Sequence, residues 1–171
     1  MPSRLGGGRF DSADGSYAFL YAGSDPVACV AETLLRDRNA VPYRVPAKRL
    51  LGLRLSELEV ARDWVVVNLF GPSLSAIGQD AWLTSCGPAD YPVTRRWAAA
   101  IRAWAPAASG LVWRARHDND RFAYVLFSDR SPHDALTVVT SDPVDKPGPA
   151  FTAVRDAARL HNAIVSLPPA R

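Results

Sequence analysis

The alternation of apolar and polar positions along the chain predicts short strands and helices in a mixed order. Runs of β-branched and aromatic residues indicate strands, because these side chains suit a half-buried pleated surface. Apolar residues that recur three and four positions apart indicate amphipathic helices. Strands are expected at residues 17–22, 50–55, 64–69, 111–116, 122–127, 136–140 and 163–167. Helices are expected at residues 26–37, 93–105 and 151–160, with a shorter one within residues 73–86.

Local signals mark the start of the first helix. Ser24 and Asp25 have short polar side chains that can cap its amino terminus, and Pro26 suits its first turn. Upstream of the first strand, residues 1–16 are rich in glycine and polar residues. Glycine relaxes the backbone and disfavours regular elements, so this segment is expected to be a loop or a loosely held arm.

The helix at residues 93–105 carries Trp97, Ile101 and Trp104 on one face, at spacings of four and three. Such a stripe is expected to pack into the core. Because strands and helices are mixed without strict strand–helix–strand alternation, the expected fold class is α+β. A chain of 171 residues suits one domain with a sizeable core, so residues 1–171 are predicted to form a single domain.

Composition does not change the predicted fold class, but it excludes several classes of protein. Hydrophobic residues make up 48% and charged residues 22%, which excludes disorder as the main state. The net charge is +3 without a run of five basic residues, so direct nucleic-acid binding is not expected. Apolar runs are shorter than the ~20 residues of a membrane span, so no membrane association is expected. Cys29 and Cys86 form no Cys-x-x-Cys pattern and fit reduced thiols in a cytoplasm.

Several motifs of catalysis and metal binding are missing from the sequence. It contains no Gly-x-Ser-x-Gly elbow, no His-Glu-x-x-His pair, no Walker loop and no Gly-x-Gly-x-x-Gly fingerprint. The histidines, His117, His133 and His161, are isolated from one another. The acidic stretch 118–120 lacks the later glycine and glutamate of a calcium loop, and a polar hairpin turn explains it better. No metal site is therefore expected.

Glu32 is the first candidate for chemistry. In its predicted helix it falls on the margin of the apolar face, next to Ala28 and Leu35. One interpretation is an ordinary helix pair with Arg36, four residues further on. The other is a partly buried carboxylate beside the strand that carries Tyr21. An anion in that place would stabilise a positively charged ribosyl transition state.

Arg9 and Tyr21 are the candidates that would complete such a site. Arg9 follows three glycines, which let a backbone approach a ligand closely. Its planar guanidinium matches the geometry of a phosphate, and Tyr21 offers an aromatic platform. Taken alone, Arg9 is equally consistent with a surface arginine, and Tyr21 with a core aromatic residue. The residues by themselves leave both interpretations open.

Two stretches of the sequence carry a family pattern. The first, GGRFDSADGSYAFLYAGSDPVACVAETL, has Gly-Gly-Arg with an aromatic residue next, then Leu-Tyr, then a helix bearing alanine and glutamate. This pattern resembles the RES family of NAD-consuming toxins. The second stretch, GLVWRARHDNDRFAYVLF, resembles the second conserved block of that family, and the resemblance covers nearly all of the chain. The matching positions of the first block are Arg9, Phe10, Leu20, Tyr21, Ala28 and Glu32.

This resemblance implies a compact α+β domain similar to the ADP-ribosyltransferase fold, with a split β-sheet, flanking helices and an NAD cleft. It implies an enzyme that consumes NAD by phosphorolysis or hydrolysis of the nicotinamide–ribosyl bond, or by ADP-ribose transfer. NAD is then a substrate rather than a cofactor, and inorganic phosphate is a candidate co-substrate. The resemblance also implies a cytoplasmic toxin encoded beside a helix-turn-helix antitoxin that blocks its site. It allows a homodimer within that complex.

The resemblance assigns roles to four residues. Arg9 is expected to hold the phosphates or a ribose of NAD, and Tyr21 to pack against the nicotinamide end. Glu32 is expected to hydrogen-bond the ribose hydroxyls and to stabilise the oxocarbenium-like state as neutral nicotinamide leaves. Arg116 is expected in the NAD-binding set. Arg9 and Glu32 form the expected catalytic pair.

Two features depart from the family pattern. The second block of the family carries a serine where this sequence has Ala115, between Arg114 and Arg116. Six residues precede Gly7, whereas the family pattern includes an earlier strand with an arginine. Residues 1–8 are therefore expected to be a flexible or truncated arm. Two alternatives stay open, a catalytically silent protein that binds NAD or an antitoxin without turnover, and a protein ADP-ribosyltransferase.

Overall fold

The structure is a computed structural model that describes residues 7–131 and 134–169. The chain divides into two units, which we call unit 1 and unit 2. Unit 1 contains the chain up to Ala22 together with Arg62–Arg114 and Phe122–Ala135. Unit 2 contains Gly23–Ala61, Ala115–Arg121 and the chain from Leu136 onward. Strands and helices are mixed throughout, which confirms the predicted α+β class.

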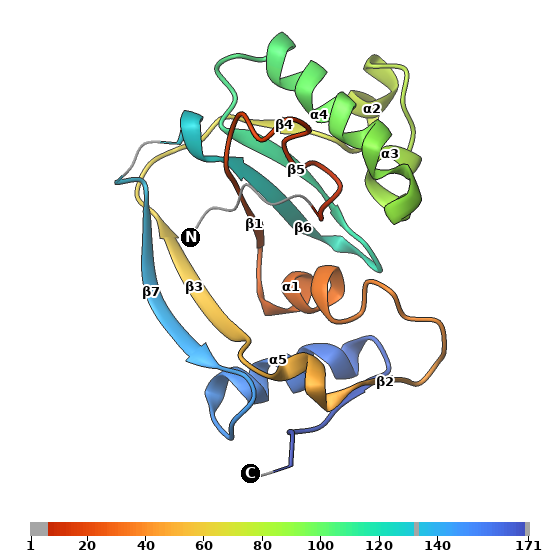
Figure 1. The fold of residues 1–171 in the computed structure, drawn as a ribbon, viewed down its shortest axis with the longest axis vertical. Coiled ribbons are helices and arrows are strands. Elements are labelled where there is room, and N and C mark those ends of the chain that lie inside the picture. The colour runs from red at the N-terminus through yellow and green to blue at the C-terminus, as the bar shows by residue number, and fades with distance from the viewer. Residues whose placement is uncertain (1–6, 132–133, 170–171) are drawn as a thin grey trace. The chain divides into compact units, whose positions relative to one another are not determined.

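A four-stranded sheet with strand order β1-β6-β5-β4 forms the centre of unit 1 (Figure 1). β4 runs parallel to β5 and pairs Val66 with Gly110. Apart from Arg114, every residue of β5 is buried, as expected for an inner strand. The strands predicted near residues 17–22, 64–69, 111–116 and 122–127 are thus all present. Their bounds are β1 (Phe19–Gly23), β4 (Val66–Asn68), β5 (Gly110–Ala115) and β6 (Asp118–Phe127).

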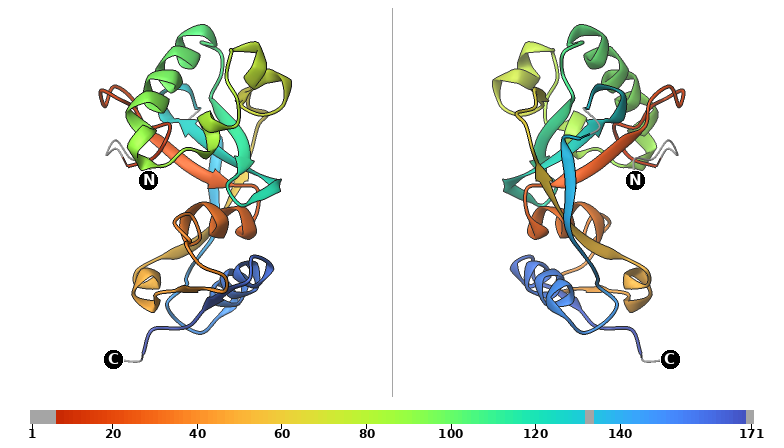
Figure 2. Two further views of the ribbon diagram at one scale, coloured as in Figure 1. Left: turned by 90° about the vertical axis from the view of Figure 1, so that its right-hand side faces the viewer. Right: turned by 90° about the vertical axis from the view of Figure 1, so that its left-hand side faces the viewer.

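Helix α4 is the longest helix of unit 1 among the described residues and lies beside the four-stranded sheet in both views of Figure 2. It buries Tyr91, Thr94, Ala98 and Ile101, which are three or four residues apart and so share one face. The shorter helices fall within the segment where one helix was predicted. The bounds are α2 (Pro72–Ala76), α3 (Trp82–Ser85) and α4 (Tyr91–Trp104), with the 3-10 turns η2 (Pro88–Asp90) and η3 (Ser128–Arg130).

The predicted core stripe on this helix is only partly correct. Ile101 is 3% exposed, but Trp104 is 63% exposed. Trp97 and Trp104 lie roughly a quarter turn around the helix from the buried face, given about 100° per residue. Their rings meet edge to face with centroids 6.0 Å apart. The two tryptophans therefore flank the core rather than fill it.

Residues 9–12 pack inside unit 1. Phe10 is fully buried and its ring meets the ring of Trp113 edge to face at 5.1 Å. The other three residues of this segment are at most 5% exposed. The loosely held arm predicted for residues 1–16 is therefore wrong for this part, although the segment is a loop. Residues 1–6 lie outside the described ranges.

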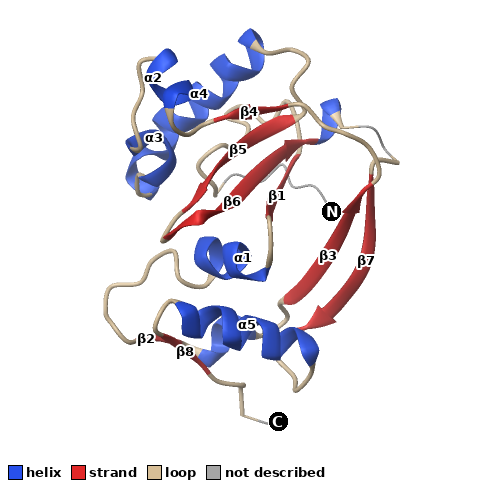
Figure 3. Ribbon diagram, turned by 180° about the vertical axis from the view of Figure 1, so that it is seen from behind, coloured by secondary structure: helices blue, strands red, loops and turns tan. Residues whose placement is uncertain are grey.

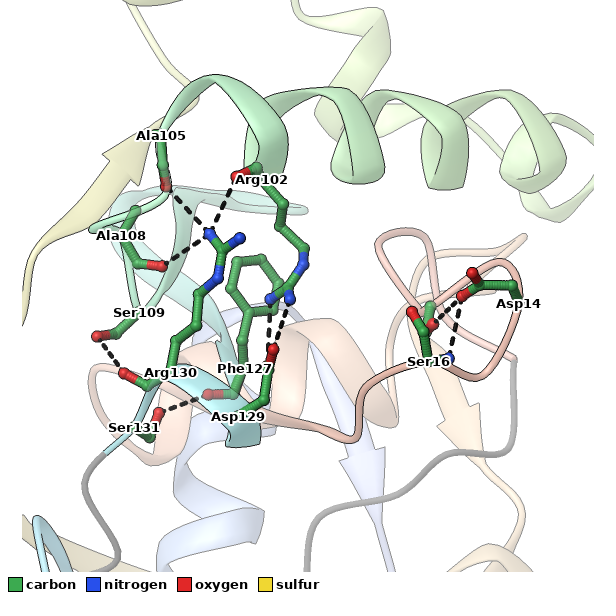
Figure 4. Close-up of polar contacts among 11 residues, drawn as sticks. Asp14, Ser16, Arg102, Ala105, Ala108, Ser109, Phe127, Asp129, Arg130 and Ser131 are labelled. Carbon is green, nitrogen blue, oxygen red and sulfur yellow. Dashed lines mark hydrogen bonds and ion pairs between the residues drawn. The ribbon is translucent and has the colours of Figure 1, made fainter.

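Two arginines close the carboxyl end of α4 (Figure 4). The Arg130 guanidinium donates to the carbonyl oxygens of Arg102 and Ala105, at 3.0 and 3.1 Å. Arg102 in turn donates twice to the Asp129 carboxylate, at 2.8 and 3.3 Å, and stacks over the Phe127 ring. The last carbonyls of a helix lack partners within the helix, and a cation there complements the helix dipole. Arg130 therefore acts as the carboxyl-terminal cap of α4.

Arg130→Met is expected to lower the free energy of unfolding by about 2 kcal/mol, because carbonyl groups at the end of α4 lose a charged donor. Chemical denaturation followed by tryptophan fluorescence measures this change. Arg96→Met is the matched control on the same helix, because the Arg96 side chain is exposed. Unchanged stability of Arg130→Met would contradict the capping role.

Unit 2 combines two helices with two small sheets. β2 pairs with β8 in parallel, and β3 pairs with β7 in antiparallel fashion with a bulge after Glu57. Figure 3 shows both strand pairs and the packing of α1 next to α5. The bounds are α1 (Pro26–Thr33), β2 (Tyr43–Val45), the 3-10 turn η1 (Ala47–Leu50), β3 (Arg54–Val60), β7 (Leu136–Pro143), α5 (Pro149–Leu160) and β8 (Ala163–Val165).

One hydrophobic core joins α1, α5 and the β2–β8 pair. It draws on segments from both ends of the unit's sequence, so neither helix buries its apolar face without the other. Removing this apolar surface from water is the main favourable contribution to the folding of unit 2. The buried members are Val30, Leu34, Leu35, Val45, Leu50, Val144, Ala150, Val154, Ala157, Ala158, Ala163 and Val165.

Helix α1 starts where the sequence predicts and ends earlier. The Asp25 carboxylate accepts the backbone N–H of Ala28 at 2.8 Å, which confirms the predicted cap. The helix ends at Thr33 rather than at Asp37. Arg49 donates to the carbonyl oxygen of Thr33 at 2.8 Å and to the next carbonyl at 3.2 Å. A charged side chain from η1 thus satisfies the helix end, where the sequence pattern predicted another helical turn.

The strand predicted at residues 50–55 is wrong. The chain forms η1 up to Leu50, and β3 begins only at Arg54. Leu50 is fully buried at the end of η1, whereas Leu51 and Leu53 are 49% and 42% exposed, so most of this apolar run lies at the surface in the turn before β3. The sequence also did not predict β2. Its partner β8 aligns Ala163 with Tyr43, which is 163 − 43 = 120 residues away in the chain.

Three predictions about the whole chain stay predictions. They are the single domain at residues 1–171, the flexible arm at residues 1–8 and the similarity to the ADP-ribosyltransferase fold. Within the described ranges, 7–131 and 134–169, no helix has both the length and the apolar character needed to cross a lipid bilayer.

Candidate functional site

A buried carboxylate holds together residues 7–12 of unit 1, a segment that we call the glycine loop. Asp11 is 1% exposed, and its Oδ2 atom accepts the backbone N–H groups of Gly7 and Gly8. Its Oδ1 atom accepts the hydroxyl of Tyr21 at 2.8 Å. The same hydroxyl accepts the backbone N–H of Phe10 at 2.9 Å. Asp11 therefore links the loop to β1 and holds the Tyr21 hydroxyl close to Gly8.

The two described glycines of this loop have different surroundings. A Cβ atom on Gly8 would lie 2.6 Å from Asp11 Oδ1 and 2.6 Å from the Tyr21 hydroxyl. A Cβ atom on Gly7 would meet nothing within 4 Å. The close approach expected at the glycines is therefore present at Gly8, but the partners are Tyr21 and Asp11 of the same chain.

Arg9 is an internal cation of unit 1. It is 3% exposed, and its guanidinium donates to the carbonyl oxygen of Cys86 at 3.1 Å. It also lies 5.7 Å from the ring centre of Tyr91. Among the described residues, its buried Nε atom has no hydrogen-bond partner. The Thr94 hydroxyl donates to the Arg9 carbonyl oxygen at 2.6 Å, which anchors this part of the loop to α4. Arg9 thus supplies positive charge from inside the unit.

Tyr21 has a hydrogen-bonded hydroxyl and a partly exposed side chain. The residue is 38% exposed, and its ring meets the rings of Phe19 and Trp113 edge to face. Burial of the hydroxyl and the neighbouring Asp11 carboxylate raise the pKa of Tyr21 well above its ordinary value. The phenol therefore stays protonated at physiological pH. This side chain offers an aromatic surface rather than a proton-transfer group.

Glu32 lies half-buried on α1 in unit 2. Its Oε1 atom accepts the backbone N–H of Arg116 at 2.6 Å. Arg116 directly follows β5, so the end of that strand fixes the orientation of the carboxylate. Arg36 lies beyond the end of α1, and the pair between Arg36 and Glu32 stays a prediction. The contact with Arg116 makes Glu32 a partly buried carboxylate that a backbone N–H group orients.

An ion network supports the amino end of α1, the helix that carries Glu32. Asp25, which caps this helix, also accepts a hydrogen bond from the Arg121 guanidinium at 2.8 Å. Arg121 donates a second hydrogen bond to Asp118, again at 2.8 Å. Both are charge-assisted contacts, which are stronger than neutral hydrogen bonds. They connect the start of α1 to the start of β6 within unit 2.

The predicted site residues fall into two groups. Arg9 and Tyr21 meet around Asp11 in unit 1, and Glu32 meets the backbone of Arg116 in unit 2. The sequence interpretation missed Asp11. A signal for it was present, because an aspartate three residues after a glycine can accept backbone N–H groups of its own loop.

Position 115 stands at the point where the second conserved block departs from the family. Ala115 is the last residue of β5 and is 1% exposed. The next residue, Arg116, supplies the N–H group that binds Glu32. A methyl group thus occupies the position at which the resemblance predicts a serine, one residue from the anchor of the carboxylate.

Metal binding finds no support in the part of the chain that the structure describes. There, no group of three histidine, cysteine or acidic side chains is placed to hold a metal ion. His161 lies 3.6 Å from Asp118, and burial lowers its pKa, which favours a neutral imidazole. His133 lies outside the described residues.

Comparison with known protein families agrees with the pattern in the two sequence blocks. The family described as RES domain matches residues 1–151 of the 171. The chain belongs to the RES domain family. This family is associated with toxin–antitoxin systems and with enzymes that process NAD. No curated protein and no solved structure matches the chain significantly.

The match to the RES domain ends within α5. Unit 2 nevertheless uses the residues after 151, since Val154, Ala157, Ala163 and Val165 all belong to its hydrophobic core. The part of the first block that lies on α1 therefore packs in a core that the last part of the chain helps to build.

Proposed function

We propose that this RES domain protein cleaves NAD at the nicotinamide–ribosyl bond, by phosphorolysis or hydrolysis. The observation that carries the proposal is the orientation of Glu32, whose carboxylate accepts the N–H group of Arg116 at 2.6 Å. This contact joins the two conserved blocks of the family in one unit. An oriented, partly buried carboxylate is suited to stabilise positive charge that develops on a ribose.

The proposed reaction replaces one bond to the anomeric carbon by another. The carbon–nitrogen bond breaks, and its electron pair leaves with nicotinamide, which becomes neutral. Positive charge then develops on the ribose, opposite the Glu32 carboxylate. Inorganic phosphate forms a phosphoribosyl product, whereas water forms ADP-ribose and releases a proton. Because the leaving group is neutral, the step needs no strong general acid.

The remaining site residues are assigned to binding. Arg9 provides a buried cation behind the glycine loop, which suits the phosphates or a ribose of NAD. The Tyr21 ring packs against the nicotinamide end. Arg116 orients Glu32 through its backbone, and its side chain belongs to the proposed NAD-binding set.

The test is nicotinamide release from NAD by the purified full chain, with and without inorganic phosphate. We expect release, and the mass of the second product distinguishes phosphorolysis from hydrolysis. Labelled NAD that marks proteins in a lysate would instead favour ADP-ribose transfer. Lack of release under both conditions would contradict cleavage. Release that survives both Arg9→Ala and Glu32→Ala would reject the site.

A second candidate function rests on Ala115. If the family serine is needed for turnover, the chain binds NAD or an antitoxin without cleaving the nucleotide. Calorimetry that detects NAD binding in the absence of nicotinamide release would favour this candidate.

The proposed cellular setting follows the family. We propose a cytoplasmic toxin that is blocked by a helix-turn-helix antitoxin, and we propose a homodimer for the complex with that antitoxin. Co-purification with the product of a neighbouring helix-turn-helix gene tests this setting.

A further inference from the structure

Arg95 is a second cation at the glycine loop, and it differs from Arg9 in accessibility. It lies on α4, and its Nε atom donates to the carbonyl oxygen of Gly8 at 3.1 Å. Its side chain is 24% exposed, whereas Arg9 is 3% exposed. The guanidinium of Arg95 is therefore fixed at one edge by Gly8, and the side chain as a whole stays partly exposed.

The acid nearest to Arg95 already has its hydrogen bonds. Asp11 accepts from two backbone N–H groups and from the hydroxyl of Tyr21. Its distance to the nearest Arg95 nitrogen is 3.8 Å, longer than a hydrogen bond. Within the described ranges, the terminal nitrogens of Arg95 have no hydrogen-bond acceptor, although a guanidinium carries five N–H groups. These donors are available to a ligand.

The charge balance of the loop favours an anionic ligand. Arg9 and Arg95 contribute two positive charges, and Asp11 contributes one negative charge, so the cluster carries a net charge of about +1. Tyr21, which is 38% exposed, lies on the neighbouring strand β1, and its hydroxyl is joined to Gly8 through Asp11. A planar guanidinium together with an aromatic side chain suits a phosphate ester that carries an aromatic base, such as a nucleotide.

We infer that Arg95 binds the pyrophosphate of NAD and so sets the preference for the dinucleotide over its nucleoside. This inference rests on the proposed function. It adds a solvent-accessible phosphate ligand that the family pattern of the sequence did not indicate. Its terminal N–H groups donate to phosphate oxygens while its Nε–H remains bonded to Gly8, so binding requires no rearrangement of the loop.

The experiment compares two substrates with the same scissile bond, NAD and nicotinamide riboside, which lacks the pyrophosphate. Arg95→Gln is expected to raise KM for NAD about tenfold or more, because a charge-assisted bidentate contact is lost. Cleavage of nicotinamide riboside is expected to stay within about twofold. Arg95→Lys keeps the charge without the planar fork and is expected to fall between the two. Arg96→Gln, the exposed neighbour on α4, is the control and is expected to match the wild type.

Two results would overturn the inference. Equal losses with both substrates would show that Arg95 only supports the loop through Gly8. An unchanged KM for NAD in Arg95→Gln would show that Arg95 does not meet the phosphates. If the wild type cleaves neither substrate, the proposed function fails and calorimetry with ADP-ribose decides the role of Arg95. Weaker ADP-ribose binding by Arg95→Gln than by the wild type supports it, and equal binding, or a wild type that does not bind, rejects it.

Discussion

Glu32→Gln is expected to reduce the rate of nicotinamide release by about a hundredfold to a thousandfold, the range seen when an electrostatic contact to a transition state is removed. Glutamine has the shape of glutamate, and its carbonyl oxygen can still accept the N–H group of Arg116. The substitution therefore removes the negative charge and keeps the geometry. Since NAD carries full positive ribosyl charge only in the transition state, kcat should fall while KM changes only a few-fold.

The control for Glu32→Gln is the same change on an exposed carboxylate of unit 2, Glu57→Gln on β3. It should leave kcat and KM for NAD unchanged. Thermal melts of both variants check that the folded state persists. A Glu32→Gln protein that keeps more than a third of the wild-type kcat would contradict the charge-stabilising role. An equal loss in Glu57→Gln would show that the assay reports stability rather than chemistry.

The sequence predicted those elements of the fold that depend on local signals. The helix α1 begins at its Asp25 cap, and α4 and α5 form where apolar periodicity predicts helices. The buried face of α4 nevertheless differs from the predicted tryptophan stripe. Features that depend on distant partners were not predicted. The end of α1 depends on Arg49, sixteen residues beyond Thr33 (49 − 33 = 16), and β2 depends on β8. Local pattern does not carry this information, because tertiary contacts override propensity.

The candidate site divides in a similar way. Arg9, Tyr21 and Glu32 were selected through family resemblance, since spacing alone left each of them with an ordinary structural interpretation. Their surroundings depend on tertiary structure. The burial of Arg9 and the partial exposure of Arg95 both depend on the packing of α4 against the glycine loop. A single sequence does not report which of two arginines faces solvent.

Gly8→Ala is expected to destabilise unit 1 by about 3 kcal/mol and to abolish most NAD cleavage, because an added methyl group forces packed atoms apart. The new Cβ atom would lie 2.6 Å from both Asp11 Oδ1 and the Tyr21 hydroxyl. Neither side chain can move away easily. Asp11 is 1% exposed, and the Tyr21 hydroxyl makes two hydrogen bonds. Relief of the overlap therefore breaks the contacts that place Tyr21 and Arg95 at the loop.

Gly7→Ala provides the matched control, because a Cβ atom there meets nothing within 4 Å. Its free energy of unfolding, measured by urea denaturation, should stay within about 0.5 kcal/mol of the wild type. Tyr21→Phe tests the cause directly. It removes the hydroxyl that would overlap with the new methyl group and leaves the overlaps with Tyr21 Cζ at 2.8 Å and with Asp11. The double variant should therefore lose somewhat less stability than the sum of the two single losses. Equal effects of Gly7→Ala and Gly8→Ala would refute the steric argument, since only backbone entropy would then distinguish glycine from alanine in this loop.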